Sequence, residues 1–125
     1  LTNIEKSKID TPEKAKEYIA LIDKTIHEGK QGKHIRGHNN YVEGRSYLTI
    51  SNQRIQQLVD EYAGKGQPQF TRKNIWKNTE LVSHSEPIGV SINNKTGVHT
   101  PTSKFYIHYS QNGTHIVPTM KGEEK

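Results

Sequence analysis

The chain has 125 residues, the size of a single domain, and only 30% of them are hydrophobic. Its 18 Lys and Arg outnumber 13 Asp and Glu, and the formal charge of +5 favours a polyanionic partner, with nucleic acid first. The sequence has no cysteine, which excludes disulfides and thiol nucleophiles, and it has no run near the ~18 apolar residues of a membrane span, so we expect no membrane partner.

Residues 1–125 are therefore predicted to form one domain, and we expect a monomer. Because the chain opens at Leu1 rather than at Met, we expect it to be the C-terminal module of a longer protein. Residues 1–10 are polar and are predicted to be a flexible lead-in.

Two helices are predicted in the first half of the chain. The first begins with Thr11 as N-cap and Pro12 at the first helical position, and Gly29 is predicted to end it. The second has Ser51 as its N-cap and extends from residue 52 to about residue 63. Apolar residues recur at three- and four-residue spacing in both helices, as Ala15, Tyr18, Ile19, Ile22 and Ile26, and as Ile55, Leu58, Val59 and Tyr62.

The segment between the helices, residues 30–47, has no sustained apolar period. We predict a loop or an irregular hairpin, because Gly32 and Gly37 disfavour a helix. Its basic and imidazole residues are interleaved with glycine and asparagine: Lys30, Lys33, His34, Arg36, His38 and Arg45. Small residues let backbone N–H groups approach an anion, so the segment is a candidate phosphate-binding loop.

Strands are predicted in the second half. Residues 65–69 are expected to be a turn-rich link, and strands are expected within 74–83, at 88–92, and from Val98 onward after a turn at 93–97. A short strand is also expected at 48–50. Helices followed by strands predict an α+β fold, in which the N-terminal helices pack on one face of a C-terminal antiparallel sheet of about four strands.

The last predicted hairpin, Lys104 to Val117, carries the most suggestive chemistry. Asn112-Gly113 between two alternating runs predicts a two-residue type I′ turn, which would pair Ser110 with His115. One face would be apolar, and the other would hold most of the polar side chains: Lys104, Tyr106, His108, Ser110 and His115. If the loop were longer, we would expect His115 to leave the polar face and His108 to stay.

Histidine titrates near pH ~6.5, so two histidines can serve as base and acid at neutral pH. Cleavage of RNA without a metal requires a base for the 2′-OH, an acid for the leaving 5′-oxygen, and cations for the phosphorane. We assign His108 and His34 as the acid–base pair, with His115 as a substitute for either, and Lys104 and Arg45 as the cations. The predicted substrate-binding residues are Lys33, His38, Ser46, Tyr106, Ser110 and Thr102.

Two alternatives remain open from the residues alone. His34 and His38 have the i, i+4 spacing of two zinc ligands, and His38-Asn39-Asn40 is similar to a metal-dependent nuclease motif, although the glycines disfavour the helix that either site needs. The chain could also be a non-catalytic module that binds nucleic acid or serves a structural role. The leading prediction requires no cofactor and no metal.

Two stretches resemble the motifs of a known family. Lys33-His34-Ile35-x-Gly37-His38-Asn39-Asn40-Tyr41 with Gly44-Arg45-Ser46-Tyr47-Leu48 resembles the first motif of the bacterial polymorphic toxin type 50 domain. Lys104-Phe105-x-Ile107-His108-Tyr109-Ser110 with Gly113-Thr114-His115-Ile116-Val117-Pro118 resembles its last motif, and the likeness extends over most of residues 26–122.

The resemblance implies a ribonuclease toxin with a barnase-, colicin- and RelE-like fold. Such domains occur at the C-termini of secreted polymorphic toxins and of phage-head-type proteins. The resemblance also implies secretion from the producer and delivery to the cytoplasm of a target cell. The implied substrate is RNA, with tRNA as one candidate, and the implied partner is a cognate immunity protein. In the non-catalytic alternative, the chain would be a nucleic-acid-binding or structural module of a phage-head-type protein.

Overall fold

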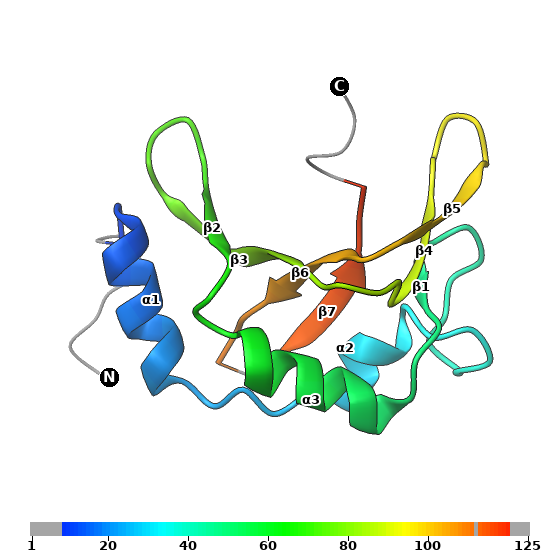
Figure 1. Ribbon diagram of the computed structural model, residues 1–125, viewed down its shortest axis with the longest axis horizontal. Helices are drawn as coiled ribbons and strands as arrows, with labels where there is room; N and C mark the ends of the chain where they lie inside the picture. The colour runs from blue at the N-terminus through cyan, green and yellow to red at the C-terminus, as the bar shows by residue number, and fades with distance from the viewer. Residues whose placement is uncertain (1–8, 112, 121–125) are drawn as a thin grey trace.

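The computed structural model describes residues 9–111 and 113–120 as an α+β fold with two antiparallel sheets (Figure 1). One sheet has four strands in the order β2-β3-β6-β7, and the other has three in the order β1-β4-β5. The elements are α1 (Pro12–Leu21), α2 (Glu28–Gly32), β1 (Tyr47–Leu48), α3 (Asn52–Tyr62), β2 (Gln67–Phe70), β3 (Trp76–Ser83), β4 (Gly89–Ile92), β5 (His99–Thr102), β6 (Lys104–His108) and β7 (His115–Pro118). The expected sheet of about four strands is present, and the second sheet was not predicted.

The two long helices begin where the sequence predicts. The side chains of Thr11 and Ser51 accept hydrogen bonds from the backbone N–H groups of Lys14 and Arg54, at 3.2 and 3.1 Å. The helix α1 ends at Leu21 rather than at Gly29, so that prediction is wrong. The Lys24 ammonium donates to the carbonyls of Ile19 and Ile22, which stabilises this early end.

The core lies between the helices and the four-stranded sheet. The Tyr18 ring of α1 packs edge-on against Trp76 of β3, with ring centroids 5.6 Å apart, and Tyr62 of α3 packs likewise on Phe105 of β6 at 6.3 Å. Each fully buried large apolar side chain stabilises the fold by roughly 1.5–3 kcal/mol. The fully buried members include Ile19, Ile55, Leu58, Val59, Phe105, Ile107 and Ile116.

Three further predictions need correction. Residues 67–70 form the strand β2 rather than a turn-rich link; Pro68 is accommodated next to a bulge in this edge strand. Residues 28–32 form the short helix α2, which Gly32 does not prevent, because His27 caps it by accepting from the Lys30 N–H. Ile9 is 1% exposed and therefore is no flexible lead-in, whereas residues 1–8 lie outside the described part.

The register of the β6–β7 hairpin differs from the prediction by two residues. His115 pairs with His108, not with Ser110, and residues 109–114 connect the strands. The ladder stops at His108 because the next backbone groups bond elsewhere: the Tyr109 N–H donates to the Asn78 carbonyl and the Thr114 N–H to the Thr25 carbonyl. Asn112, on which the turn prediction rests, lies outside the described residues.

A two-residue offset leaves every side chain on its predicted face. Phe105, Ile107 and Ile116 are buried, and His108 and His115 share the opposite face. The expectation that a longer loop would remove His115 is therefore wrong, because the new register places it directly across from His108.

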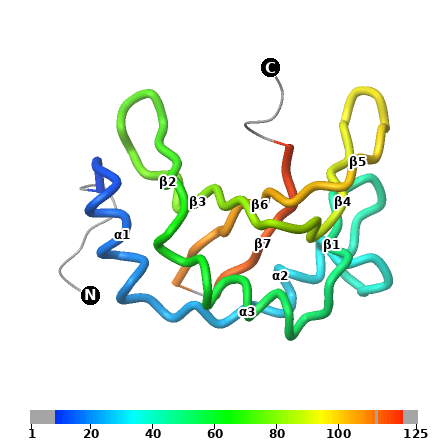
Figure 2. The backbone as a smooth tube through the Cα atoms, viewed as in Figure 1, coloured from blue at the N-terminus to red at the C-terminus, as the bar shows by residue number. Residues whose placement is uncertain are grey.

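The two sheets are joined by a very short connection. Only Ser103 separates β5 from β6, and Figure 2 shows the chain continuing from one strand into the other. Close approach of the sheets is required at Gly89, where an added Cβ would lie 2.6 Å from the Tyr47 carbonyl oxygen and 2.7 Å from Pro118. No helix formed by the described residues has the length and apolar character needed to cross a membrane.

Candidate active site

Three histidines from separate parts of the chain form a series of parallel rings. The rings of His108 and His115, on neighbouring strands, are stacked with centroids 4.8 Å apart and planes 9° apart. The ring of His34, which follows α2, is stacked on His115 at 6.1 Å and 8°. His115 is therefore the ring that both others contact. We call these three residues the histidine series.

Gln31 fixes the position of α2 against the edge of the four-stranded sheet. Its side-chain amide donates to the Ile116 carbonyl at 2.9 Å and accepts from the Ile116 N–H at 2.8 Å. The side chain thereby satisfies the backbone of edge strand β7 as a neighbouring strand would. Gln31 is 2% exposed, and this paired contact holds the segment that carries His34 over His115.

The tautomer of His34 follows from its hydrogen bond. Its Nδ1 lies 3.0 Å from the Ser46 carbonyl oxygen, which can only accept, so Nδ1 carries the proton. The lone pair of the neutral ring is then on Nε2. Ser46 is held in turn, because its hydroxyl oxygen accepts from the Ile92 N–H at 3.0 Å. Ser46 acts on the site by orienting His34.

Burial keeps the three imidazoles neutral. Desolvation is the main cause in each case: it lowers the pKa of His108 to about 4, with a further contribution from His34. The pKa of His115 is lowered to about 3 by burial and then by its two neighbouring histidines and by Lys30 and Lys33. The pKa of His34 is also lowered, although its bond to Ser46 opposes the shift.

Cationic side chains surround the buried rings. Lys30 donates to the Ser110 hydroxyl at 3.0 Å, which connects α2 to the loop after β6. Lys33 and Arg45 are exposed, and both act on His34 electrostatically. The site therefore combines buried neutral bases with positive charge at its border, which suits an anionic ligand.

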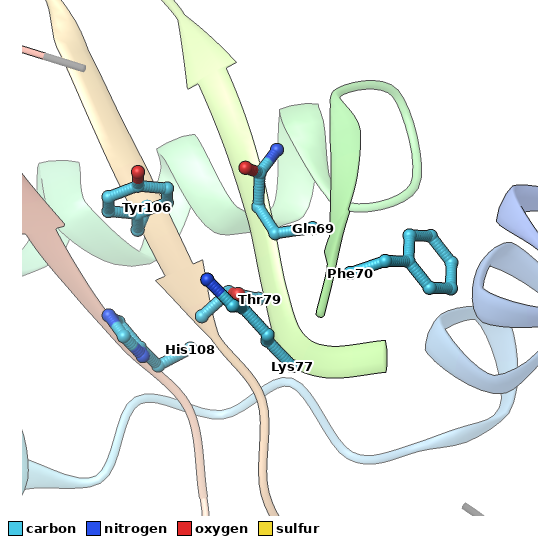
Figure 3. A pocket seen from close by; sticks show the side chains of 6 residues that line it. All are labelled: Gln69, Phe70, Lys77, Thr79, Tyr106 and His108. Atoms are coloured by element: carbon cyan, nitrogen blue, oxygen red, sulfur yellow. The ribbon is translucent and has the colours of Figure 1, made fainter. Parts of the chain in front are cut away.

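A pocket of about 480 Å³ adjoins His108 on the side away from His115 and α2. It is lined by Gln69, Phe70, Lys77, Thr79, Tyr106 and His108. Figure 3 shows Tyr106 and His108 at alternate positions of β6, with Lys77 and Thr79 of β3 and Gln69 of β2 beside them. Thr79 is the cross-strand partner of His108 in β3, and Tyr106 contacts the His108 ring edge-on at 6.0 Å.

Other predicted site residues have structural partners. The ring of His38 bonds to the Glu28 carboxylate of α2 and to the Asn40 N–H, so both its nitrogens have partners within residues 28–40. The Thr102 hydroxyl donates to the Thr119 carbonyl and accepts from the Lys104 N–H, and Thr102 is 3% exposed. Lys104 lies at the opposite end of β6 from His108, roughly 13 Å away at about 3.3 Å per residue.

Several residues at this site were not predicted. Nothing in the sequence pattern indicated Gln31, because a side chain that pairs with the backbone of a distant strand produces no apolar periodicity. Gln69 and Phe70 were missed together with β2, and Lys77 and Thr79 would have been found by asking which β3 residues face His108. Lys30 stood out only as one basic residue of the loop. Among residues 9–111 and 113–120, no group of three or more His, Cys, Asp or Glu is placed to hold a metal ion.

Comparison with known proteins decides the family. The family model for bacterial toxin 50 matches residues 26–118, which include all three histidines and both motifs. The chain belongs to the bacterial toxin 50 family. It is thus a bacterial toxin domain, and the match begins after α1. No curated protein matches the chain.

Proposed function

We propose that this toxin domain is a metal-independent endoribonuclease that uses the histidine series for acid–base catalysis. The observation that carries the proposal is the stacking of His34, His115 and His108, with the tautomer of His34 fixed by Ser46. Buried imidazoles with lowered pKa values, next to basic residues, are typical of functional sites.

His34 is the general base and His108 the general acid in this proposal. The Nε2 lone pair of His34 takes the proton of the ribose 2′-OH, and the 2′-oxygen forms a bond to phosphorus. The bond from phosphorus to the 5′-oxygen breaks, and His108 gives that oxygen its proton. The products are a 2′,3′-cyclic phosphate and a 5′-OH, and no water or metal enters this step.

The order of the rings suits this division of roles. In a displacement at phosphorus, the attacking and leaving oxygens lie roughly in line, so the base and the acid belong on opposite sides of the phosphate. His34 and His108 are the two rings connected through His115. His115 would face the phosphate between them, and Lys30 would stabilise its developing charge.

In the free protein, the lowered pKa values leave the base in the neutral form that it needs, but they leave the acid without the proton that it must donate. His34 is neutral at pH 7 and ready to accept a proton. His108, with a pKa of about 4, must gain a proton before it can donate one. A bound phosphodiester carries the negative charge that raises a neighbouring histidine pKa, so substrate binding itself would charge the acid.

As a toxin, the domain would be secreted by its producer and delivered into the cytoplasm of a target cell. Its substrate there would be RNA, with tRNA as one candidate, and a cognate immunity protein would protect the producer. The basic residues bordering the histidine series would bind both polyanionic RNA and an acidic inhibitor surface.

Digestion of a defined RNA in the presence of EDTA tests the proposal. We expect cleavage to persist, to leave 2′,3′-cyclic phosphate ends, and to spare DNA of the same sequence, which has no 2′-OH. Loss of cleavage on chelation, or equal cleavage of DNA, would contradict it.

A further inference from the structure

The pocket beside His108 has the composition of a nucleobase site. Its volume of about 480 Å³ is within the usual range of small-ligand sites, roughly 300–1,000 Å³. It is open to solvent and combines an aromatic ring with an amide, a hydroxyl and an ammonium group, on Tyr106, Gln69, Thr79 and Lys77.

We propose that this pocket binds the base of the nucleotide on the 3′ side of the scissile phosphate, the one whose 5′-oxygen leaves. This inference rests on the proposed function, because it uses His108 as the acid. The acid must lie next to the leaving oxygen, and His108 itself lines the pocket. The nucleoside that carries this oxygen is therefore the one nearest the pocket.

The four-stranded sheet gives the substrate a direction. His34 lies at the β7 edge, where Gln31 fastens α2, and the pocket extends from β6 across β3 to β2. An RNA strand that places its 2′-OH at His34 and its leaving oxygen at His108 would run across the sheet from β7 towards β2. Its 5′ nucleotide would lie near α2 and its 3′ nucleotide in the pocket.

Three of the pocket residues have a defined contribution to base binding. The Tyr106 ring offers a face for stacking, which accepts any base. Gln69 donates from Nε2 to the Gln67 carbonyl at 2.8 Å, which orients the amide and leaves Oε1 as an acceptor. Lys77 is exposed and supplies a donor with positive charge, whereas Figure 3 shows the Phe70 ring pointing away from the other five side chains.

Binding of dinucleotides with a 2′-deoxy sugar on the 5′ side tests the pocket without requiring cleavage. We expect Tyr106→Ala to weaken their binding on the order of tenfold, and Tyr106→Phe to keep it, because stacking needs the ring but not the hydroxyl. Lys77→Ala should weaken binding, and Lys65→Ala, which removes an exposed lysine outside the pocket, serves as the matched control. Equal binding by wild type, Tyr106→Ala and Lys77→Ala would overturn the inference.

Cleavage of ribodinucleotides with all four bases at each position tests the direction. We expect Gln69→Ala, which removes the acceptor Oε1 from the pocket, to reduce discrimination among 3′ bases and to leave discrimination among 5′ bases as it is. A change at the 5′ base alone would overturn the inference while the proposed function stands. A wild-type protein that cleaves no ribodinucleotide would contradict the proposed function, and the binding measurement would still decide whether the pocket holds a base.

Discussion

The two faces of strands β3 and β6 differ in whether their buried polar groups have hydrogen-bond partners. On the core face, Glu80 is 0% exposed, and its carboxylate accepts from the Gly64 N–H at 3.0 Å, the Gly66 N–H at 2.7 Å and the Tyr109 hydroxyl at 2.6 Å. On the other face, Nδ1 of His115 is buried without a hydrogen-bond partner among the described residues.

The comparison separates a structural cluster from the candidate site. Every Glu80 oxygen is paired, and burial and the carboxylate raise the pKa of Tyr109 so that its hydroxyl stays protonated as a donor. Such a network stabilises the fold. The histidine series instead holds a buried, unpaired nitrogen, Nδ1 of His115, which destabilises the fold. We therefore expect substitutions on the two faces to separate stability from activity.

The largest effect is expected at the histidine series. His34→Ala and His108→Ala should each lower kcat/KM for RNA by about 10²–10⁴-fold, because each removes one proton-transfer group. The free energy of unfolding should fall less than in Glu80→Ala, since His34 makes one side-chain hydrogen bond, to Ser46, whereas the Glu80 carboxylate accepts three. His38→Ala is the matched control, because both nitrogens of His38 are bonded to Glu28 and Asn40, and the change should affect cleavage far less.

The second largest effect, a loss of stability, is expected from Glu80→Ala. The change leaves two backbone N–H groups and the Tyr109 hydroxyl without their acceptor, and should lower the free energy of unfolding by about 3–5 kcal/mol in urea denaturation. Glu80→Gln keeps one acceptor oxygen and should lose less. If Glu80→Ala unfolded as wild type does, the cluster would have no structural role.

Gln31→Ala is expected to affect both properties. It leaves the Ile116 N–H and carbonyl unpaired at a buried edge, which costs about 2–4 kcal/mol of stability, and it releases the segment that carries His34. Cleavage by the folded fraction, measured well below the unfolding midpoint, should therefore also fall. Unchanged cleavage in a destabilised protein would show that α2 does not position His34.

The last prediction is a dependence of stability on pH. His108 and His115 have folded pKa values of about 4 and about 3, below the ordinary value near ~6.5, so the unfolded chain binds more protons between these limits. Stability should fall as pH decreases from about 6.5 towards 4. A His108→Asn, His115→Asn double variant should show a shallower decrease in thermal unfolding, and an unchanged slope would contradict these pKa shifts.

The sequence predicted both faces of the β6–β7 hairpin but not its register. Alternation defines which side chains share a face, whereas the loop length depends on where Tyr109 and Thr114 find backbone partners, and those are Asn78 and Thr25. The caps at Thr11 and Ser51 were predictable because their hydrogen bonds are local. The end of α1 was not, because the apolar stripe continues to Ile26 although the helix does not.

The candidate site was predicted in its chemistry and only partly in its membership. His34, His108 and His115 were chosen for their residue type and strand pattern, and the fold places them together. Lys104 was chosen because it shares the polar face of the hairpin, but it lies at the far end of β6 from the rings. Thr102 was chosen because it precedes that strand, but its hydroxyl is bonded to Thr119. Tertiary contacts of this kind, like that of Gln31, leave no local pattern.

The division of roles between His34 and His108 is tested most directly by changing the leaving group. A uridine 3′-phosphodiester with a p-nitrophenyl group loses a weakly basic phenolate, which needs no proton from an acid, whereas a dinucleotide loses a basic alkoxide. His108→Ala should therefore be strongly impaired on the dinucleotide and nearly as active as wild type on the aryl ester. His34→Ala should be impaired on both, and equal impairment of both variants on both substrates would contradict the account.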